Sequence, residues 1–371
     1  MEYKWETKPL GELVTFSSGG TPSKKNSNYW GGTIPWISAK TMKDERISTS
    51  DLMITEEGLR AGSKLAPAGS VLLLTRGSGL FNGIPVCLVE KPVAFNQDVK
   101  CMEASGAVSM RFIFYWLKSQ ADYLKAKLDV TGIGAGKFDT AFLKELQVPV
   151  PSAEEQNKIV AIADAISNRI AVNRKINDNL QQQAQAIYTA MFISNADPAW
   201  EQGRLSDLIT VKYGKDHKKL ADGAYPVFGS GGIMRYVERP LHTGESVLIP
   251  RKGTLNNVMY VNEPFWSVDT MFFTEMKIPN VAKFVFHFVK AKDLASMNAG
   301  SAVPSMTTDI LNALELAIPS AERLAEFESV VAPMYQTMQA NNRESAKLAE
   351  LRDTLLPKLI SGKIDVSSVK L

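Results

Sequence analysis

Two segments of the chain place apolar residues three and four positions apart, the spacing of an amphipathic helix. In the first segment, residues 152–196, these positions are Ile159, Ile162, Ile166, Ile170, Ile176, Leu180, Ile187 and Met191. In the second, residues 320–371, they are Phe327, Val331, Met334, Met338, Leu348, Leu351 and Leu355. Each series approximates a heptad seam, so the pattern predicts two long helices that each carry one apolar stripe.

The ends of these helices carry their own signals. Ser152 followed three residues later by Glu155 forms a capping box, which predicts that the first helix begins there. In the second helix, Pro333 and Pro357 predict kinks and Gly362 predicts the end. The first helix has no internal proline, so the two copies differ at this point.

Two apolar stripes in one chain are most simply buried against each other, which predicts an antiparallel coiled-coil pair. Forty residues at 1.5 Å each would make a rod of roughly 60 Å. Asn173 and Asn341 lie at the middle of the stripes, 168 residues apart. We expect them to meet on a pseudo-two-fold axis and to fix the register, as buried asparagines do in coiled coils. Alternatively, both are partly exposed polar residues on an amphipathic helix.

The remaining residues, 1–151 and 197–319, show the patterns of mixed α/β domains. The expected helices are Met110–Lys127 and Val281–Leu294. The expected strands are Val71–Thr75, Val86–Val89, Val247–Ile249, Val258–Val261 and Met271–Phe273. The predicted fold class is therefore α+β, with two globular domains separated by two long helices.

The chain repeats itself. LQVPVPSAEEQ (146–156) aligns with LELAIPSAERL (314–324) at an offset of 168 residues. Upstream, PLGEL (9–13) corresponds to RLSDL (204–208), GSVLLLTRG (69–77) to ESVLIPRKG (245–253), and FNQDV (95–99) to WSVDT (266–270). Self-similarity at this period indicates a pseudo-two-fold internal repeat, each copy being a globular domain followed by a helix.

Amino-acid composition says less about function than the repeat does. The net charge is +3, with 18 Lys and Arg against 15 Asp and Glu in residues 1–150, and 13 against 12 in residues 200–319. A nucleic-acid binder usually shows a larger excess, so positive charge would have to gather on one face or come from a partner. Only Cys87 and Cys101 are present, with three histidines, which argues against a disulfide framework or a zinc site. No apolar run is long enough to span a membrane and no signal-peptide pattern appears, so we expect a cytoplasmic protein.

Catalytic and cofactor-binding signatures are missing from the sequence. The closest approach to a phosphate-binding loop, GIGAGKF (132–138), lacks the first glycine and the final hydroxyl residue. Asp216-His217-Lys218 resembles half of a metal-nuclease motif, but a solvated loop explains it more simply. We therefore predict no catalytic residue, no metal site and no cofactor.

Loops that suit contact with nucleic acid occur in both halves. SSGGTPSKKNSNYWGGTIPWIS (17–38) combines glycines, which let the backbone approach a phosphate, with hydroxyl, lysine and aromatic side chains. Our candidates there are Gly19, Gly20, Thr21, Lys24, Lys25 and Trp36. In the second half, TVKYGKDHKK (210–219) and YPVFGSGG (225–232) supply Tyr213, Lys215 and Ser230. Ordinary tight turns and core packing of the tryptophans remain the alternative.

Two arginines stand at matching places, each directly after an apolar strand. They are Arg76 and Arg251, the second followed by Lys252. An arginine on a rigid strand end is well placed to contact guanine or phosphate with two hydrogen bonds. The alternative is an ion pair with Asp98 or Asp269. Asn96 and Gln97 are further candidates, because an amide pairs with adenine.

With these features established, the chain resembles the specificity subunits of Type I restriction-modification systems along essentially its whole length. The resemblance rests on the two-copy arrangement and on PLGELVTFSSGGTP (9–22), YWGGTIPWIS (29–38), VPVPSAEEQNKIV (148–160), SVLIPRKG (246–253) and LRDTLLPKLISGKI (351–364). It implies target-recognition domains at 1–151 and 197–319, each reading half of a split DNA site. The helices at 152–196 and 320–371 would space them and hold two modification subunits. The positions expected at the interface between the helices or with a partner are Ile159, Ile166, Asn173, Leu180, Phe327, Met334, Asn341 and Leu348.

The resemblance also implies which subunit carries each activity. Methyl transfer from S-adenosylmethionine to adenine would belong to the modification subunits, and ATP-driven translocation and cleavage to restriction subunits. Two readers on a rigid spacer should contact half-sites about one helical turn apart on double-stranded DNA. Because the two globular domains differ, the site should be asymmetric. Rival interpretations are a specificity subunit of a fused or methylation-only system, an enzyme with an unseen motif, and a coiled-coil scaffold that binds no DNA.

Overall fold

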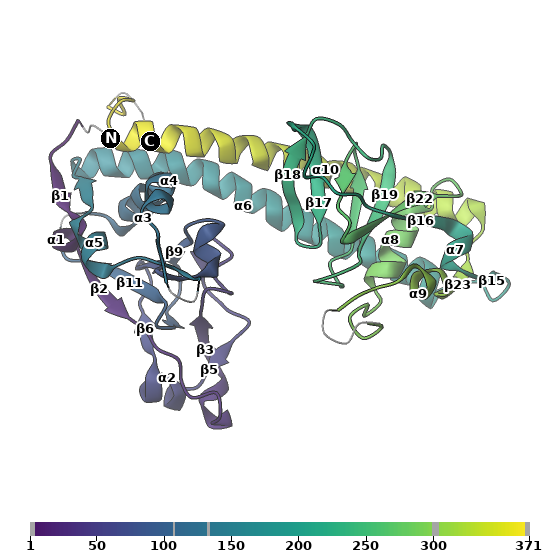
Figure 1. Cartoon of the computed structure of the whole chain (residues 1–371), viewed down its shortest axis with the longest axis horizontal. Helices are drawn as coiled ribbons and strands as arrows, with labels where there is room; N and C mark the ends of the chain where they lie inside the picture. The colour runs from purple at the N-terminus through teal and green to yellow at the C-terminus, as the bar shows by residue number, and fades with distance from the viewer. Residues whose placement is uncertain (1–3, 107, 132–133, 299–303, 368–371) are drawn as a thin grey trace. The chain divides into compact units, whose positions relative to one another are not determined.

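A computed structural model describes residues 4–106, 108–131, 134–298 and 304–367. It divides the chain into two compact units, one of Met1–Val172 with Arg343–Leu371 and one of Asn173–Asn342. Each unit contains one globular part, seen in Figure 1, and one half of each long helix. Each has its own apolar core, so we describe the two units separately.

A five-stranded sheet forms the centre of unit 1. Its strands follow the order β2-β11-β7-β9-β4, in which only β4 and β9 run parallel. Their bounds are β2 Val14–Ser18, β4 Arg46–Ile47, β7 Val71–Leu74, β9 Val86–Val89 and β11 Val99–Ala104. Every residue of β7 and β9 is buried, which explains why these strands read as continuous apolar runs.

One face of this sheet is covered by a helix that ends earlier than expected. The sequence predicted a single helix over Met110–Lys127, but α3 (Met110–Ser119) ends at Gln120 and α4 (Ala121–Ala126) continues as a separate helix. The Gln120 backbone departs from helical geometry, with φ −93° and ψ 6°. Six consecutive side chains of α3, from Phe112 to Leu117, are buried. The helix is therefore part of the core rather than a surface layer.

Unit 2 repeats this architecture with one strand fewer. Its sheet has the order β16-β22-β19-β20, all antiparallel, formed by β16 Ile209–Tyr213, β19 Glu245–Pro250, β20 Met259–Asn262 and β22 Met271–Met276. The helix that corresponds to α3 is α8 (Ala282–Lys290), in which eight residues are buried. Strands β19, β20 and β22 and this helix agree with the sequence prediction to within a few residues at each end, whereas β16 was not predicted.

Smaller sheets complete each unit. Unit 1 adds β5-β3-β10-β6, β12-β13-β8 and the pair β1-β14, and unit 2 adds β18-β17-β21 and the pair β15-β23. Their bounds in unit 1 are β1 Thr7–Pro9, β3 Trp30–Ile37, β5 Met53–Ile54, β6 Lys64–Ala66, β8 Arg76–Gly77, β10 Val93–Phe95, β12 Asp129–Val130, β13 Gly136–Lys137 and β14 Gln147–Pro149. In unit 2 they are β15 Glu201–Arg204, β17 Asp222–Gly229, β18 Gly232–Val237, β21 Trp266–Ser267 and β23 Glu315–Ile318. The short helices are α1 Leu10–Leu13, α2 Glu56–Gly62, α5 Thr140–Glu145, α7 Leu205–Leu208 and α9 Thr308–Asn312, with η1 Ser27–Tyr29 and η2 Ser78–Phe81.

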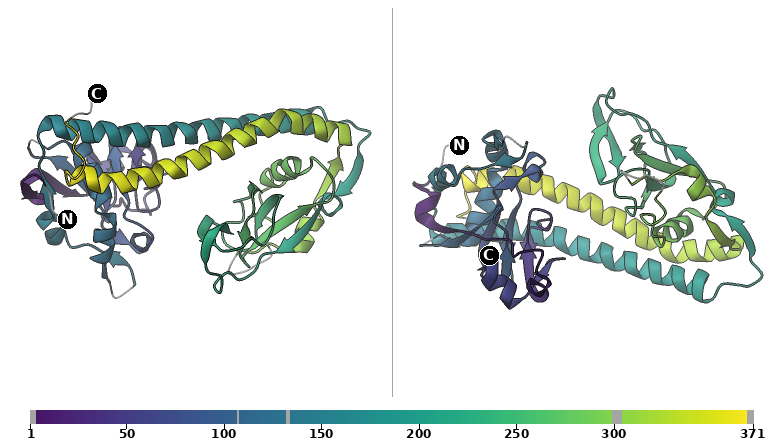
Figure 2. Two further views of the ribbon diagram at one scale, coloured as in Figure 1. Left: turned by 90° about the horizontal axis from the view of Figure 1, so that it is seen from above. Right: turned by 60° about the horizontal axis from the view of Figure 1, so that its bottom comes forward.

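The two long helices are α6 (Ala153–Thr189, extended by the π-helical turn η3, Ala190–Ser194) and α10 (Ala321–Ile360). Figure 2 shows them lying side by side and antiparallel, as expected. The capping box is present, because Glu155 accepts from the Ser152 N–H at 3.0 Å and the Glu155 N–H donates to the Ser152 hydroxyl at 3.3 Å. Gly362, with φ 74°, follows the last turn of α10, and the helix runs without interruption through Pro333.

The predicted stripe of α6 is wrong at its centre. Ile176 is 39% exposed, whereas Asn173 is fully buried and Asn177 is half-buried. Ile176 comes six residues after Ile170, which is not a whole number of turns in a helix of 3.6 residues per turn, so its side chain points away from the stripe. The seam continues instead through positions 173, 177 and 180. The middle of the helix pair is therefore polar.

Asparagines fill this polar centre, as the sequence suggested. The Asn173 amide donates to the backbone carbonyl of Asn341 at 3.4 Å, and the Asn341 amide donates to Asn177 Oδ1 at 2.8 Å. Asn177 in turn donates to Asn342 Oδ1 at 2.8 Å. The expected meeting of Asn173 with Asn341 is confirmed as a contact, and its role in fixing the register remains a prediction.

Among the described residues, no helix is long and apolar enough to cross a bilayer.

Candidate DNA-binding loops

In unit 1, a glycine turn follows the first strand of the sheet and is held against the neighbouring loop. The Gly20 N–H donates to the Phe95 carbonyl at 2.9 Å. A β-carbon on Gly19 would lie 1.9 Å from that carbonyl oxygen, so no other residue fits there without moving the backbone. The Thr21 hydroxyl donates to Gln97 Oε1 at 2.7 Å, which joins the turn to the loop after β10. Sequence reasoning chose these residues, and the structure brings them together.

Arg76 lies beside this pair of loops. Thr75, the residue before it, donates to the Asp98 carbonyl through its N–H at 2.8 Å and through its hydroxyl at 3.0 Å. Arg76 itself is exposed, and among the described residues it forms no ion pair with Asp98 or any other carboxylate. The ion-pair alternative is therefore not what the structure shows.

A lysine that the sequence analysis did not select stands next to Arg76. In the β8–β13 ladder, Arg76 lies directly opposite Lys137, and both are exposed. Residues directly opposite in an antiparallel pair have side chains on the same face, so two positive charges share one patch. Lys137 belongs to the GIGAGKF segment, of which Gly132 and Ile133 lie outside the described residues. Lys137 was missed because its position opposite a strand-end arginine is revealed only by the pairing of β8 with β13.

Two other candidates in unit 1 turn out to support the loops from within. Trp36 is 4% exposed, and its indole N–H donates to the Gly20 carbonyl at 3.1 Å. Asn96 is 6% exposed and bonds Asp98 through its amide at 3.3 Å. Buried side chains cannot reach a base edge in this arrangement, so we assign both to positioning. Lys24, Lys25 and Gln97 are exposed and stay candidates for direct contact.

Unit 2 holds its glycine turn in the same way. A β-carbon on Gly214 would lie 2.0 Å from the Val268 carbonyl oxygen. The Lys215 N–H donates to the Ser267 carbonyl at 2.8 Å, and the Trp266 indole donates back to the Lys215 carbonyl at 2.8 Å. Thus in each unit the indole N–H of a buried tryptophan donates to the glycine turn, although the two tryptophans lie on strands that do not correspond. Asp216, whose carboxylate accepts from the Lys218 N–H at 3.1 Å, forms a local turn.

The strand-end arginine of unit 2 has different neighbours. The Arg251 guanidinium lies 5.4 Å from the centre of the Tyr213 ring and donates to the Asp269 backbone carbonyl at 3.0 Å. Lys252 is exposed beside it, and Ser230 is held near this turn because Asn257 donates to its carbonyl at 2.8 Å. Tyr213, 53% exposed, therefore presents a ring and a cation together.

An exposed apolar strand adds to this surface and was also missed. Ile233, Met234 and Tyr236 on β18 are 50%, 61% and 49% exposed. They follow Gly232, whose φ of 113° turns the chain into the strand. No candidate was named on this strand from the sequence. Exposed apolar side chains are suited to contact with thymine methyl groups or a base step.

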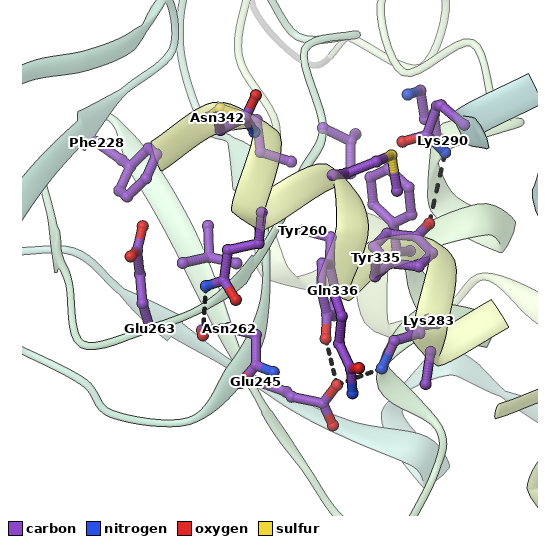
Figure 3. A pocket seen from close by; sticks show the side chains of 18 of the residues that line it. Phe228, Glu245, Tyr260, Asn262, Glu263, Lys283, Lys290, Tyr335, Gln336 and Asn342 are labelled. Carbon is purple, nitrogen blue, oxygen red and sulfur yellow. Dashed lines mark hydrogen bonds and ion pairs between the residues drawn. The ribbon is translucent and has the colours of Figure 1, made fainter. Parts of the chain in front are cut away.

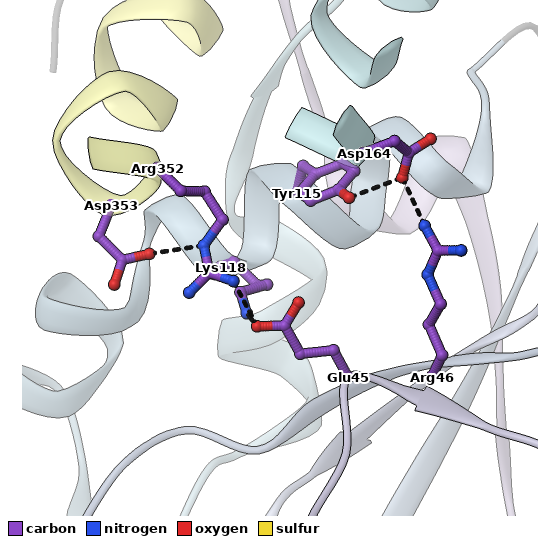
Figure 4. A network of polar contacts seen from close by, with 7 residues as sticks. All are labelled: Glu45, Arg46, Tyr115, Lys118, Asp164, Arg352 and Asp353. Atoms are coloured by element: carbon purple, nitrogen blue, oxygen red, sulfur yellow. Dashed lines mark hydrogen bonds and ion pairs between the residues drawn. The ribbon is translucent and has the colours of Figure 1, made fainter. Parts of the chain in front are cut away.

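A buried polar network ties the loops of unit 1 to the long helices (Figure 4). On α6, Asp164 accepts from Arg46 at 2.8 Å, from Tyr115 at 2.6 Å and from Arg111. Glu45 accepts from Lys118 and, at 2.6 Å, from Arg352 on α10. Burial by itself would raise the pKa of the Glu45 carboxyl, but these two cations lower it below its ordinary value.

Unit 2 has a matching network between α8 and the long helices. Lys283, whose side chain is 4% exposed, donates to Glu245 at 2.7 Å and to Glu328 on α10 at 2.6 Å. His287 is fully buried between Gln185 at 2.7 Å and the Tyr335 hydroxyl at 2.9 Å. Burial lowers the pKa of His287 to about 3, with a smaller effect of Lys290, so the ring is neutral.

The helix positions expected at the interface between the helices or with a partner are mostly interior. Ile159 and Phe327 are fully buried, while Leu180 and Met334 pack against the core of unit 2. Ile166, Asn341 and Leu348 are half-buried. Phe327 contacts Phe192 edge-on with ring centres 5.1 Å apart, so it joins the two helices rather than facing outward. Among the described residues, no group of acidic, histidine and cysteine side chains could hold a metal ion.

Comparison with known proteins accounts for this architecture. Residues 2–182 and 198–345 match the family described as the Type I restriction modification DNA specificity domain. The MjaIX Type I restriction enzyme specificity subunit of Methanocaldococcus jannaschii is 23% identical, over 98% of this chain and 94% of its own length. The EcoR124I/EcoR124II specificity subunit of Escherichia coli is 32% identical over 53% of this chain and 50% of its own. The crystal structure of a Type I system S subunit from M. genitalium has the same fold, with a TM-score of 0.54, 18% identity and 96% of each chain covered.

Proposed function

The chain belongs to the family of Type I restriction-modification DNA specificity subunits, and on that premise we propose that it reads a two-part, asymmetric site in double-stranded DNA. As a specificity subunit it is the non-catalytic, target-recognising component of its complex. Two modification subunits would methylate adenine at the site it selects, and restriction subunits would cleave. The proposed division is one target-recognition domain at 1–151, one at 197–319, and helices at 152–196 and 320–371.

One observation carries this proposal. The same strand-end arrangement occurs twice, with a glycine turn, a buried tryptophan and an arginine around one end of each sheet. Two copies on separate cores predict two half-sites, and the repeat places them in one chain. The exposed side chains around the two ends differ, with Lys137 beside Arg76 and Tyr213 beside Arg251. Different side chains select different bases, so the half-sites should not be identical.

The residues proposed for contact fall into two groups. Backbone and lysine groups of the turns, at Gly19, Gly20, Lys24, Lys25, Lys215 and Lys252, suit phosphates. The arginines, Gln97, Tyr213, Thr21 and Ser230 suit base edges or sugars. Trp36 and Asn96 would act by holding the turns in place.

The experiment is to co-express the chain with the methyltransferase encoded beside it and to map methylated adenines in the host DNA by long-read sequencing. We expect a two-part motif with a fixed gap that appears only when this chain is present. Absence of new methylation from an assembled, soluble complex with a proven active methyltransferase would instead favour the scaffold interpretation. Whether restriction subunits or a fused system complete the complex is answered by the neighbouring genes.

A further inference from the structure

The outer edge of β20 is a strand position that unit 1 fills and unit 2 leaves open. In unit 1, β9 pairs on one side with β7 and on the other with β4, a parallel fifth strand. In unit 2, β20 occupies the place of β9, because Val71 pairs with Leu88 as the equivalent Val247 pairs with Tyr260. Within the described part of the chain, no strand pairs with the far side of β20.

A groove runs along this open edge (Figure 3). Its volume is about 840 Å³, and all of its lining residues belong to unit 2. The lining includes the whole of β20, side chains of α8 and one face of α10. The groove therefore lies where the fifth strand lies in the other copy, between the sheet edge and the long helix.

The groove is lined by Glu245, Glu263 and Glu328 as well as Lys283 and Lys290. Lys283 pairs with Glu245 and Glu328, so Lys290 is the charge that points to a ligand. Helices α3 and α8 align residue by residue, so that Lys118 corresponds to Lys290, and each ammonium group lies over an equivalent ring, Phe114 or Phe286. In unit 1, the fifth strand brings Glu45 to Lys118. Lys290 lines the groove, and among the described residues no carboxylate pairs with it. Its partly buried position lowers the pKa of the ammonium, as expected of a cation without a partner.

The backbone supports the same conclusion. The Leu88 N–H donates to the Glu45 carbonyl at 2.8 Å, which is how β9 holds the fifth strand. The Val247 N–H donates to the Thr274 hydroxyl of β22, so the residue opposite Val247, Tyr260, turns its N–H away from β19. Bonding alternates from side to side along an antiparallel strand, so the N–H groups of Tyr260 and Asn262 face the groove. On α10, Gln339 already reaches the strand, with its amide 3.2 Å from the Asn262 carbonyl.

We propose that this groove binds an extended acidic segment of a partner polypeptide, which adds to β20 as a parallel fifth strand and places a carboxylate on Lys290. Strand addition of this kind takes its affinity from main-chain hydrogen bonds and its selectivity from the side-chain contacts. The proposal rests on the proposed function only in that the partner is another subunit of the restriction-modification complex.

The test compares amide hydrogen exchange in the full chain alone and in the complex assembled from all co-expressed subunits. We expect exchange at Tyr260 and Asn262 to slow by about tenfold or more on assembly. The Leu88 amide is the internal control, because β4 already protects it in the free chain. Equal rates at β20 in the two states overturn the proposal, as does protection already present in the free chain or gained only on adding DNA. Failure of the complex to form would count against the proposed function instead.

Two variants sharpen the result. Asn262→Pro removes an N–H that faces the groove and leaves the bonds of Met259 and Val261 to β19, whereas Asn262→Ala shortens the side chain and keeps the N–H. Protection at Tyr260 should be lost in the proline variant and kept in the alanine variant. Lys290→Gln should reduce protection about tenfold without changing exchange at Leu88. Equal protection in all three assembled variants would contradict strand addition.

Discussion

Arg76 and Arg251 both follow a central strand, but Lys252, opposite Ser305, takes the place that Arg76 takes opposite Lys137, and Arg251 stands one residue earlier, at the place of Thr75. The two arginines also differ in how many donors remain available. Arg76 is exposed and faces Lys137 across a short ladder, so its guanidinium is directed to solvent. Arg251 already donates to the Asp269 carbonyl and lies beside the Tyr213 ring, which restricts its orientation. An oriented guanidinium is better suited to one base, whereas a mobile one beside a lysine suits either base or phosphate.

Replacing Arg76 separates these roles. If it reads a base, Arg76→Ala should weaken recognition by about 1–3 kcal/mol only at the half-site read by the first domain. If it contacts phosphate, binding should weaken alike on all sequences and the salt dependence should decrease. Competition binding of the assembled complex to sites altered in one half distinguishes the two. Lys91→Ala, an exposed change outside the candidate loops, is the control, and an unchanged affinity for every site would remove Arg76 from the interface.

The glycine turns are a second feature decided by single residues. Gly19→Ala puts a β-carbon 1.9 Å from the Phe95 carbonyl oxygen, so the turn or its neighbour must move. We expect a loss of about 2 kcal/mol or more in the free energy of unfolding, measured with urea, and weaker DNA binding. Gly83→Ala meets no atom within 4 Å and should change stability by no more than about 0.5 kcal/mol. Equal stability of the two variants would show that the turn is not held as described.

At the scale of elements, helices α3 and α8 attach each globular part to the long helices through charged and polar side chains. Arg111 and Tyr115 of α3 bond Asp164, and their equivalents on α8, Lys283 and His287, bond Glu328 and Tyr335. The repeat thus keeps the positions of these contacts while changing the residues. Breaking a buried charge pair by removing one partner costs more than the pair itself contributes, so each attachment is sensitive to single changes.

His287 makes the stability of unit 2 depend on pH. Its pKa falls from 6.5 to about 3 on burial, so between these values the unfolded chain binds a proton that the folded chain does not. The contribution of the neutral ring is complete above pH 6.5, and stability falls by up to about 1.4 kcal/mol per pH unit below it. Urea unfolding between pH 5 and 8 should show this slope. It should flatten in His287→Gln, and an unaltered slope in that variant would assign the pH dependence to other groups.

The asparagine centre of the helix pair is the other feature at this scale. Replacing Asn173 and Asn341 together by leucine removes buried amides, so the helix pair should become more stable but less exact in register. A bismaleimide crosslink between Arg169→Cys and Glu344→Cys, which replace a pair 2.9 Å apart, reports the native register. We expect lower yield and additional products in the double leucine background. An unchanged single product would show that the asparagines do not set the register.

At the scale of the whole molecule, the net charge of +3 is small for a protein that recognises DNA. Affinity for DNA depends on neutralising phosphates, and the 42 Lys and Arg of this chain are nearly balanced by 39 Asp and Glu. We therefore expect partners to add positive charge to the complex that binds DNA.

This charge balance predicts weak binding by the chain alone. At about 150 mM salt we expect the isolated chain to bind its own site at least about tenfold more weakly than the assembled methyltransferase, with a smaller slope of log K against log salt. Fluorescence anisotropy over a salt series measures both quantities. Equal affinity and equal slope would mean that the chain alone makes the phosphate contacts.

The sequence by itself determined the features that depend on neighbours along the chain. The period of apolar residues predicted both long helices, Ser152 and Glu155 predicted a helix start, and the repeat predicted two similar sheets. The places of Arg76 and Arg251 at strand ends were also readable, because a strand and the residue after it are local. The 168-residue offset even predicted that Asn173 meets Asn341.

Only the tertiary structure decided what depends on residues far apart in the chain. Strand pairing placed Lys137 beside Arg76, packing buried Trp36 under the Gly20 turn, and the rotation of α6 exposed Ile176 while turning Asn177 inward. The open edge of β20 is likewise visible only once the strand order of both sheets is known. Contacts of this kind arise from the joint packing of separate segments, for which the local pattern of one segment carries no signal.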